Sequence, residues 1–446
     1  MAPETWLRAI EDCSNDVCVT LITGPPNSGK STFARRLVNR HLTGLGKMAR
    51  PATAVCYLDL DPSKQEYAPH GQISLVLARE INLSPAFTHP ATTPDANKAS
   101  GDAIIHAHAI PTNIANYTNY YQLCVEDLFL RFKNLQSHDS SLSLVIDTPG
   151  SLYASNFNIL DALLVRIRPH NTVHLRDTNV SEGELTSKMH LLQTTASRHR
   201  STFHDITAQG PLITPLRNET ELQAMHMQSY FHVQTSSTRP SESQTVTWMP
   251  NPLSQLVPWE FCYQATAERT QDIVGFAVYT EPIEPASLIH ALNGSIVQIV
   301  QSASSIVPRP YTALPRTGRY QLPYFPQVGR TGMVEPLDPR TSTLVCTAMV
   351  RGFDPERKTV QVVLPQMYEP ALHAMSAERT VLISGCCSMP EWAFSEETYA
   401  RKGAVACTGS APVVSYPSEQ YWVGVKGTIE DMGYLDTVRR VRKFQT

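Results

Sequence analysis

The sequence predicts an α/β fold with a doubly wound, mostly parallel sheet, followed by a β-rich C-terminal domain. A glycine-rich loop directly follows a short apolar run near the N-terminus. Runs of strand type and runs of helical spacing then alternate up to about residue 233. From Trp259 onward, short apolar runs alternate with turn residues, which is typical of β-rich domains.

Hydrophobic spacing places the individual elements. Short runs of Val, Ile and Leu predict buried strands at residues 17–23, 53–60, 142–146 and 172–175. Apolar residues at helical spacing predict helices at residues 32–41, 117–136, 158–168 and 217–233. Later strands are predicted at IVGFAVYT, SIVQIVQ, STLVCTAMV, TVQVVLP, TVLISG and YWVGVKG.

Composition excludes several classes of protein. The net charge of −3 over 446 residues excludes nucleic-acid binding by overall charge, so such binding needs a local basic surface. The nine cysteines form no C-x-x-C pair, which indicates free thiols in a reducing compartment. The N-terminus lacks an apolar signal core, and no stretch reaches the ~18 apolar residues of a membrane helix. We therefore expect a soluble, intracellular protein with no membrane association.

The loop GPPNSGKS satisfies the pattern G-x-x-x-x-G-K-[ST] and predicts a P-loop NTPase. Gly24 and Gly29 let the backbone N–H groups wrap phosphates, and the helix that follows points its positive end there. Lys30 is expected to reach the β- and γ-phosphates and Ser31 to hold Mg²⁺. The other loop residues expected to bind the nucleotide are Pro25, Pro26, Asn27, Ser28 and Thr32.

Acidic residues end two of the predicted strands. Asp59 and Asp61 follow the strand at 53–60, at the end where doubly wound sheets bind ligands. We favour Asp61, which has left the strand, as a Mg²⁺ ligand or a general base, although a turn-capping aspartate is a common alternative. The stretch DTPG, from Asp147 to Gly150, fits either a γ-phosphate sensor or an ordinary β-turn.

The polar segment at about 194–217 is predicted to be a lid within a first domain, 1–233. Arg198 and Arg200 are the candidates for neutralising a transferring phosphate, with Arg217 as a third; solvated loop residues are the alternative. A linker is predicted at 234–250 and the β-rich domain at 251–446. His106 and His108 are spaced to face one side of a strand, and no metal-ligand role is predicted for them.

Taken together, these motifs identify a family resemblance. GPPNSGKSTFARRLVN resembles the P-loop and helix of the polynucleotide 5′-hydroxyl kinases of ribosomal-RNA processing, in their fungal form. YLDLDPSKQEYAPHGQISL is similar to the acidic second motif of these kinases, and LVIDTPG aligns with their asparagine/threonine/glycine motif. Further stretches extend the resemblance along nearly the whole chain: AFTHP, NYYQLCVEDLF, QSYFHV, PWEFCY, HALNGSIVQIV, PEWAFSEE and the closing VRRVRK.

The resemblance implies transfer of the γ-phosphate of ATP, with Mg²⁺, to an RNA 5′-hydroxyl. In the family, a partner endonuclease creates that end in the second internal transcribed spacer of pre-rRNA. The resemblance therefore implies a hetero-oligomer with this nuclease in the nucleus and nucleolus. It assigns phosphate and Mg²⁺ handling to Lys30, Ser31 and Thr32, and activation of the hydroxyl to Asp61.

The chain also departs from the family pattern. Ser63 and Lys64 stand where the family has glycine and glutamine, Asp147 replaces asparagine, and Ser151 replaces a tryptophan on which the terminal base stacks. The family's N-terminal β-rich domain has no counterpart before the P-loop strand, so weaker ATP binding is expected. The alternative function is a nucleotide-binding scaffold for the nuclease; a third is a P-loop switch ATPase.

Overall fold

The computed structural model describes residues 3–44, 50–91, 101–176, 182–209, 217–236, 245–267, 269–303, 314–328 and 332–396. It divides the chain into two compact units. The first comprises Met1–Tyr230, Thr235–Thr247 and Leu337–Thr343, and the second comprises Phe231–Gln234, Trp248–Pro336 and Leu344–Thr446. Among the described residues, no helix is both long and apolar enough to cross a membrane.

The first unit is built on a seven-stranded sheet of order β4-β3-β2-β5-β1-β6-β7. Strands β1, β2, β5, β6 and β7 are parallel, whereas β3 and β4 pair antiparallel at one edge. The bounds are β1 (Val19–Thr23), β2 (Val55–Asp59), β3 (Gln72–Ala78), β4 (Ala103–Ala109), β5 (Leu144–Asp147), β6 (Asn171–Arg176) and β7 (Thr202–Thr207).

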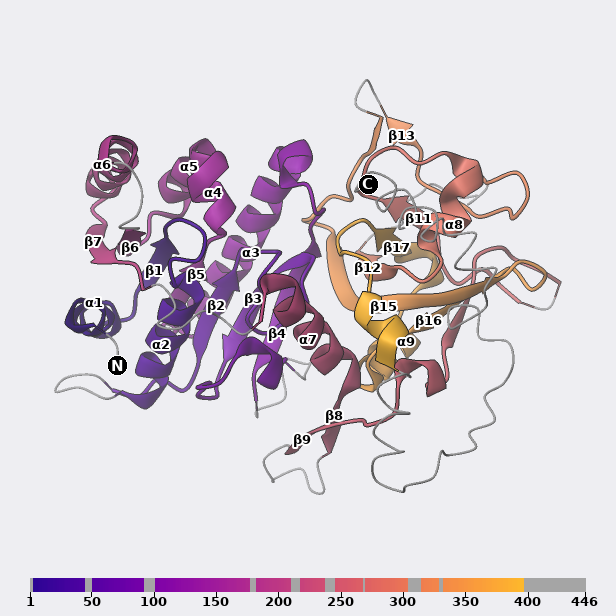
Figure 1. Cartoon of the computed structure of the whole chain (residues 1–446), viewed down its shortest axis with the longest axis horizontal. Helices are drawn as coiled ribbons and strands as arrows, with labels where there is room; N and C mark the ends of the chain where they lie inside the picture. Colours follow the sequence, from indigo (N-terminus) through magenta and orange to yellow (C-terminus); the bar gives the residue numbers. More distant parts are fainter. Residues whose placement is uncertain are drawn as a thin grey trace, which may run out of the picture. The chain divides into compact units, whose positions relative to one another are not determined.

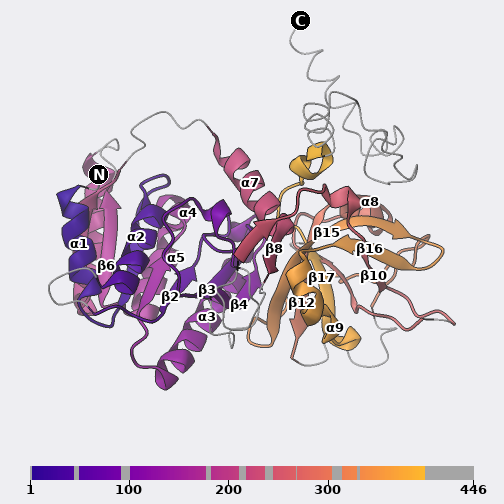
Figure 2. The ribbon, with the colours of Figure 1, turned by 90° about the horizontal axis from the view of Figure 1, so that it is seen from below.

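Helices cover this sheet (Figures 1 and 2). The core on one face joins apolar residues of α1 and α2 to the strands, with Trp6, Phe33 and Leu37 fully buried. The helices of the unit are α1 (Glu4–Ser14), α2 (Lys30–Thr43), α3 (Thr118–His138), α4 (Gly150–Ser155), α5 (Phe157–Ile167), α6 (Glu182–Arg198) and α7 (Glu219–His232). The predicted doubly wound, mostly parallel sheet is confirmed.

The second unit contains a six-stranded sheet of order β10-β16-β15-β12-β17-β11. Strands β11 and β17 are parallel, whereas β10–β16, β15–β16 and β12–β17 are antiparallel. The prediction of a β-rich C-terminal region is confirmed. Its elements are β10 (Trp259–Cys262), β11 (Gly275–Val278), α8 (Leu288–Leu292), β12 (Ile296–Ser302), β13 (Gln327–Val328), β14 (Met333–Val334), β15 (Ser342–Asp354), β16 (Thr359–Val363), α9 (Glu369–His373) and β17 (Thr380–Ser384).

The described part of the predicted lid segment, at about 194–217, has regular secondary structure. It contains the end of α6 and the whole of β7, which pairs in parallel with β6. β7 is the edge strand, and only Ile206 within it is buried, so its sequence lacks an apolar run. The predicted linker likewise contains short paired strands, β8 (Val233–Ser236) and β9 (Thr245–Trp248). The predicted strand YWVGVKG and the closing VRRVRK lie outside the described residues.

Candidate functional site

The glycine-rich loop connects the carboxyl end of β1 to the amino end of α2. Gly24 has φ +151°, and a Cβ there would lie 2.5 Å from the carbonyl oxygen of Leu175 at the end of β6. Gly29, which precedes α2, has φ +92°. Both backbone conformations favour glycine, so the loop is shaped before any ligand arrives. The free N–H groups at the start of α2 point toward this loop, as in a phosphate site.

Lys30 lies inside its own loop. Its Nζ donates a hydrogen bond to the carbonyl oxygen of Pro25 at 2.8 Å. Burial lowers the pKa of Lys30, and the negative charges of Asp147 and Asp61 oppose that shift. Ser28 also points inward: its hydroxyl is buried and has no hydrogen-bond partner among the described residues. The loop therefore holds a desolvated cation at the place where phosphates bind.

Two buried carboxylates lie side by side next to this cation. β2 and β5 are parallel neighbours, and Asp59 is the register partner of Asp147. Burial raises the pKa of Asp59, and the charge of Asp147 raises it further. Burial also raises the pKa of Asp147 to about 6, although a hydrogen bond from Ser31 and the charge of Lys30 favour its ionised form. Asp147 is thus coupled directly to the P-loop.

The residues present fit a Mg²⁺ ion. The Oδ1 atom of Asp147 is buried without a hydrogen-bond partner among the described residues, and Oδ2 accepts a hydrogen bond from the hydroxyl of Tyr57 at 3.2 Å. The Ser31 hydroxyl and the carboxylates of Asp147 and Asp61 form an oxygen-rich donor set, which Mg²⁺ prefers. The DTPG motif, a weak signal in the sequence, therefore supplies the carboxylate nearest Ser31.

Asp61 holds the turn that follows β2. Its Oδ1 accepts hydrogen bonds from the backbone N–H and the hydroxyl of Ser63, at 3.0 and 2.6 Å. The adjacent Lys64 donates to the side-chain oxygen of Asn27 in the P-loop at 3.0 Å and forms an ion pair with Glu219 of α7. The lysine that departs from the family pattern thus brings a second cation to the loop.

Glu66 fixes this acidic segment to helix α2. Its carboxylate forms an ion pair with Arg35 and accepts a hydrogen bond from His89, while its backbone N–H donates to Asp59. Although burial alone would raise the pKa of Glu66, the bonds from His89 and Arg35 hold it below its usual range. Only 3% of the side chain is exposed, so this network positions Asp59 and Asp61 rather than contacting a large ligand.

Gly150 and Trp6 support the P-loop from two sides. A Cβ at Gly150 would lie 2.7 Å from the backbone of Pro26 and 3.1 Å from Nζ of Lys30. Trp6 of α1 packs edge-on against Phe33, and its indole N–H donates to the carbonyl oxygen of Thr207. A Cβ at Gly29 would lie 3.0 Å from the Trp6 ring. Trp6 was not among the residues predicted for the site, although Trp6, Ala9 and Ile10 of WLRAI lie at helical spacing.

The structure corrects the two arginine predictions. Arg198 ends α6, and Arg200 lies just before β7, whose amino end is level with the amino end of β6. Both are exposed and lie at the edge of the sheet opposite the P-loop, because β1 and β7 run in the same direction. Arg217 remains a candidate, since it lies two residues before Glu219, which pairs with Lys64.

Ser151 is exposed in the first turn of α4, and Thr32 is exposed in α2.

Comparison with known proteins finds one matching family and several similar proteins. Residues 24–232 match the family described as the mRNA cleavage and polyadenylation factor CLP1 P-loop. The polynucleotide 5′-hydroxyl-kinase GRC3 of Gibberella zeae is 30% identical over 396 residues, which cover 86% of this chain and 52% of that protein. The kinase grc3 of Aspergillus terreus is 28% identical over 455 residues, which cover 90% and 53%. The chain spans about half the length of these curated relatives.

Two solved structures share the fold. A structure describing the extended interface between Pcf11p and Clp1p superposes with a TM-score of 0.54 at 13% identity, covering 85% of this chain and 77% of that one. Wild-type Clp1p in complex with Pcf11p gives a TM-score of 0.51 at 15% identity, covering 82% and 73%. At this level of identity the likeness concerns the arrangement of elements alone.

Proposed function

We propose that this chain, whose residues 24–232 match the CLP1 P-loop family, transfers the γ-phosphate of ATP to the 5′-hydroxyl end of RNA. One observation carries the proposal. Lys30 and Ser31 of the P-loop meet Asp147 of β5 and Asp61 after β2 at the carboxyl edge of the sheet. A phosphate cradle, an oxygen donor set and an accessible carboxylate are the parts that phosphoryl transfer requires.

The P-loop residues position and neutralise the phosphates. When ATP binds, Lys30 exchanges the carbonyl oxygen of Pro25 for phosphate oxygens, and the N–H groups from Asn27 to Thr32 surround them. Ser31 and Asp147 would hold Mg²⁺, which supplies charge neutralisation at the β- and γ-phosphates. Lys64 adds positive charge beside Asn27, where the transferred phosphate needs it.

Asp61 is the residue that accepts the proton of the RNA 5′-hydroxyl. It is half-buried, whereas Asp59 and Asp147 lie in the sheet and are almost wholly buried. Its Oδ1 is held by Ser63, so the carboxylate has a fixed orientation. Proton removal by a positioned carboxylate is worth about a hundred- to ten-thousandfold in rate.

The curated relatives are named polynucleotide 5′-hydroxyl-kinases, which supports the same reaction for this chain. We place the activity in pre-rRNA processing at the second internal transcribed spacer, in the nucleus and nucleolus, together with an endonuclease. The similar structures of Clp1p contain Pcf11p, which supports assembly with a different protein as the working form. The competing function, a nucleotide-binding scaffold, draws support from Lys64 and Ser151.

The test compares RNA ends. The chain is given γ-labelled ATP, Mg²⁺ and an RNA oligonucleotide with either a 5′-hydroxyl or a 5′-phosphate. We expect label only on the 5′-hydroxyl RNA. ATP binding without labelled RNA would contradict the kinase proposal and favour the scaffold. ATP hydrolysis at a rate that does not depend on RNA would favour the switch ATPase. A parallel DNA oligonucleotide measures the preference between the two nucleic acids.

Adding a methyl group at Gly150 should weaken ATP binding. The new Cβ of Gly150→Ala meets the backbone of Pro26 at 2.7 Å, so the P-loop must shift. Such overpacking costs about 1–3 kcal/mol. Where this cost falls on the nucleotide-binding conformation of the loop, the ATP dissociation constant rises by about five- to 150-fold. Isothermal titration with ATP measures it. The matched control is Gly318→Ala, since a Cβ at Gly318 meets nothing within 4 Å; equal affinity in both variants contradicts the prediction.

A further inference from the structure

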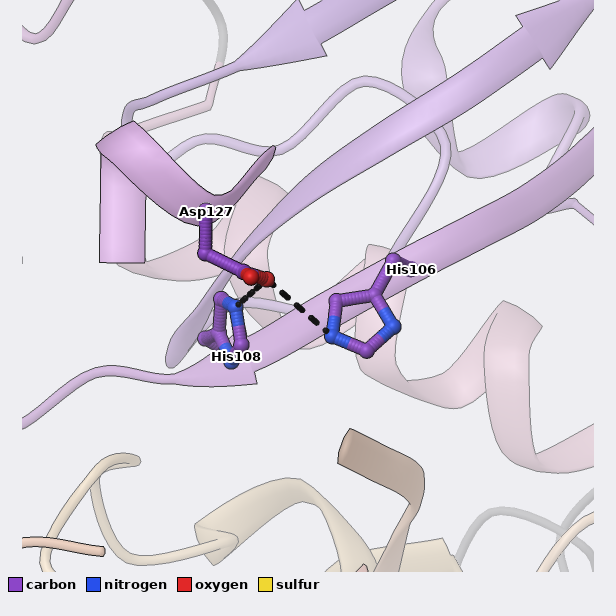
Figure 3. A group of neighbouring side chains, drawn as sticks. All are labelled: His106, His108 and Asp127. Carbon is purple, nitrogen blue, oxygen red and sulfur yellow. Dashed lines mark hydrogen bonds and ion pairs between the residues drawn. The ribbon is translucent and has the colours of Figure 1, made fainter. Parts of the chain in front are cut away.

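A buried cluster outside the P-loop brings together three metal-binding side chains. His106 and His108 project from the same face of the edge strand β4, and Asp127 projects toward them from helix α3 (Figure 3). Their ligand atoms all lie within 4.8 Å of one another. The side chains of His106, His108 and Asp127 are 5%, 1% and 10% exposed. The proposed phosphoryl transfer uses none of them.

One nitrogen in this cluster lacks a partner. The Nε2 atom of His106 is buried and has no hydrogen-bond partner among the described residues, yet it lies 3.6 Å from Oδ2 of Asp127. A hydrogen bond to the backbone of Ser342 also involves His106. With the proton on Nδ1 committed to that bond, Nε2 turns a lone pair toward a carboxylate. An imidazole lone pair and a carboxylate oxygen that face each other in a dry interior can share a bound cation.

We propose that His106, His108 and Asp127 bind a divalent transition-metal ion of the Zn²⁺ type. Two imidazoles and one carboxylate are a donor set that Zn²⁺ accepts, with water as a fourth ligand. The distances from Oδ2 of Asp127 to Nε2 of His108 and His106 are 3.0 and 3.6 Å. These two distances bracket the separation of about 3.3 Å between ligands in a tetrahedral site with bonds of about 2.0–2.1 Å. The three ligand atoms, which lie within 4.8 Å of one another, must draw closer when the ion binds.

Arg131 is the group that an ion must displace. Arg131 lies one turn after Asp127 in α3, and its Nε donates a hydrogen bond to Oδ2 of Asp127 at 2.7 Å. Because a third of its side chain is exposed, Arg131 can turn into water when the ion takes that oxygen. His108 binds the ion through Nε2 in the neutral tautomer that carries its proton on Nδ1. The bound ion ties the edge strand β4 to helix α3, and its burial indicates a structural role.

The test uses Co²⁺ as a spectroscopic probe on the chelator-treated full chain, with excess Mg²⁺ and no nucleotide. We expect one equivalent of Co²⁺ with the strong visible bands of a tetrahedral site, displacement by Zn²⁺, and a higher thermal midpoint with either ion. His106→Ala and Asp127→Asn should abolish the bands. His190→Ala, which removes an exposed histidine of α6, should leave them unchanged.

The variant Arg131→Gln makes the test independent of folding defects. It removes the competitor from Oδ2 of Asp127 and leaves all three ligands in place, so it should bind Co²⁺ more tightly than the wild-type chain. Circular dichroism reports whether each variant is folded. The proposal is overturned if neither the wild-type chain nor Arg131→Gln shows the bands, or if folded His106→Ala shows them undiminished.

Discussion

Replacing Lys30 by alanine should lower label transfer to 5′-hydroxyl RNA by about a hundred- to thousandfold. The buried ammonium is the positive charge inside the P-loop, where it now donates to the carbonyl oxygen of Pro25. Without it, the phosphates lose a charged partner in a site of low dielectric, where such contacts are strongest. Asp147 also loses the cation that favours its ionised form, so its pKa should rise further.

The measurement is a single-turnover assay with labelled ATP, combined with titration of ATP binding. Lys133→Ala is the matched control, since Lys133 is exposed on α3 and its ammonium group donates to the side-chain oxygen of Gln136 on the same helix. It should transfer label at the wild-type rate. A Lys30→Ala chain that labels RNA normally would show that the label comes from another enzyme or another site.

Replacing Asp61 by asparagine should lower the rate of transfer by about a hundred- to ten-thousandfold, with little change in ATP binding. The amide oxygen can still accept the two hydrogen bonds from Ser63, so the turn after β2 should persist. An amide does not accept the proton of the RNA hydroxyl at neutral pH. The defect should therefore lie in the chemical step and not in the affinity for ATP.

The chain offers a close control for this variant. Asp139 accepts hydrogen bonds from the backbone N–H and the hydroxyl of Ser141 in the same arrangement, but at the opposite edge of the sheet, before β5. These bonds lower the pKa of Asp139. Asp139→Asn should transfer phosphate at the wild-type rate. Unchanged turnover in Asp61→Asn, or an equal loss in Asp139→Asn, contradicts the assignment of Asp61 as the base.

The order of the strands explains why the sequence alone did not single out Asp147 as a site residue. β5 lies between β2 and β1 in the sheet, so its carboxyl end is next to both the P-loop and Asp59. That neighbour relation joins Asp147 to Asp59, 88 positions earlier, and to the P-loop, more than a hundred positions earlier, and no local pattern encodes it. The predicted role of Arg198 and Arg200 in neutralising a transferring phosphate also depended on information outside the local sequence. Their polar sequence predicted only that they lie at the surface. The direction of β7 places Arg200 at the amino edge of the sheet, away from the P-loop.

By itself, the sequence determined the P-loop, the buried strands around it and the change to a β-rich second half. These features depend on glycine conformation, apolar runs and helical spacing, which act over a few neighbouring residues. Only the tertiary structure decided which carboxylate meets Ser31, which helix supports Gly29 through Trp6, and which acidic residue completes the pair His106 and His108. Each of these depends on packing between distant segments, where burial and strand order set the partner.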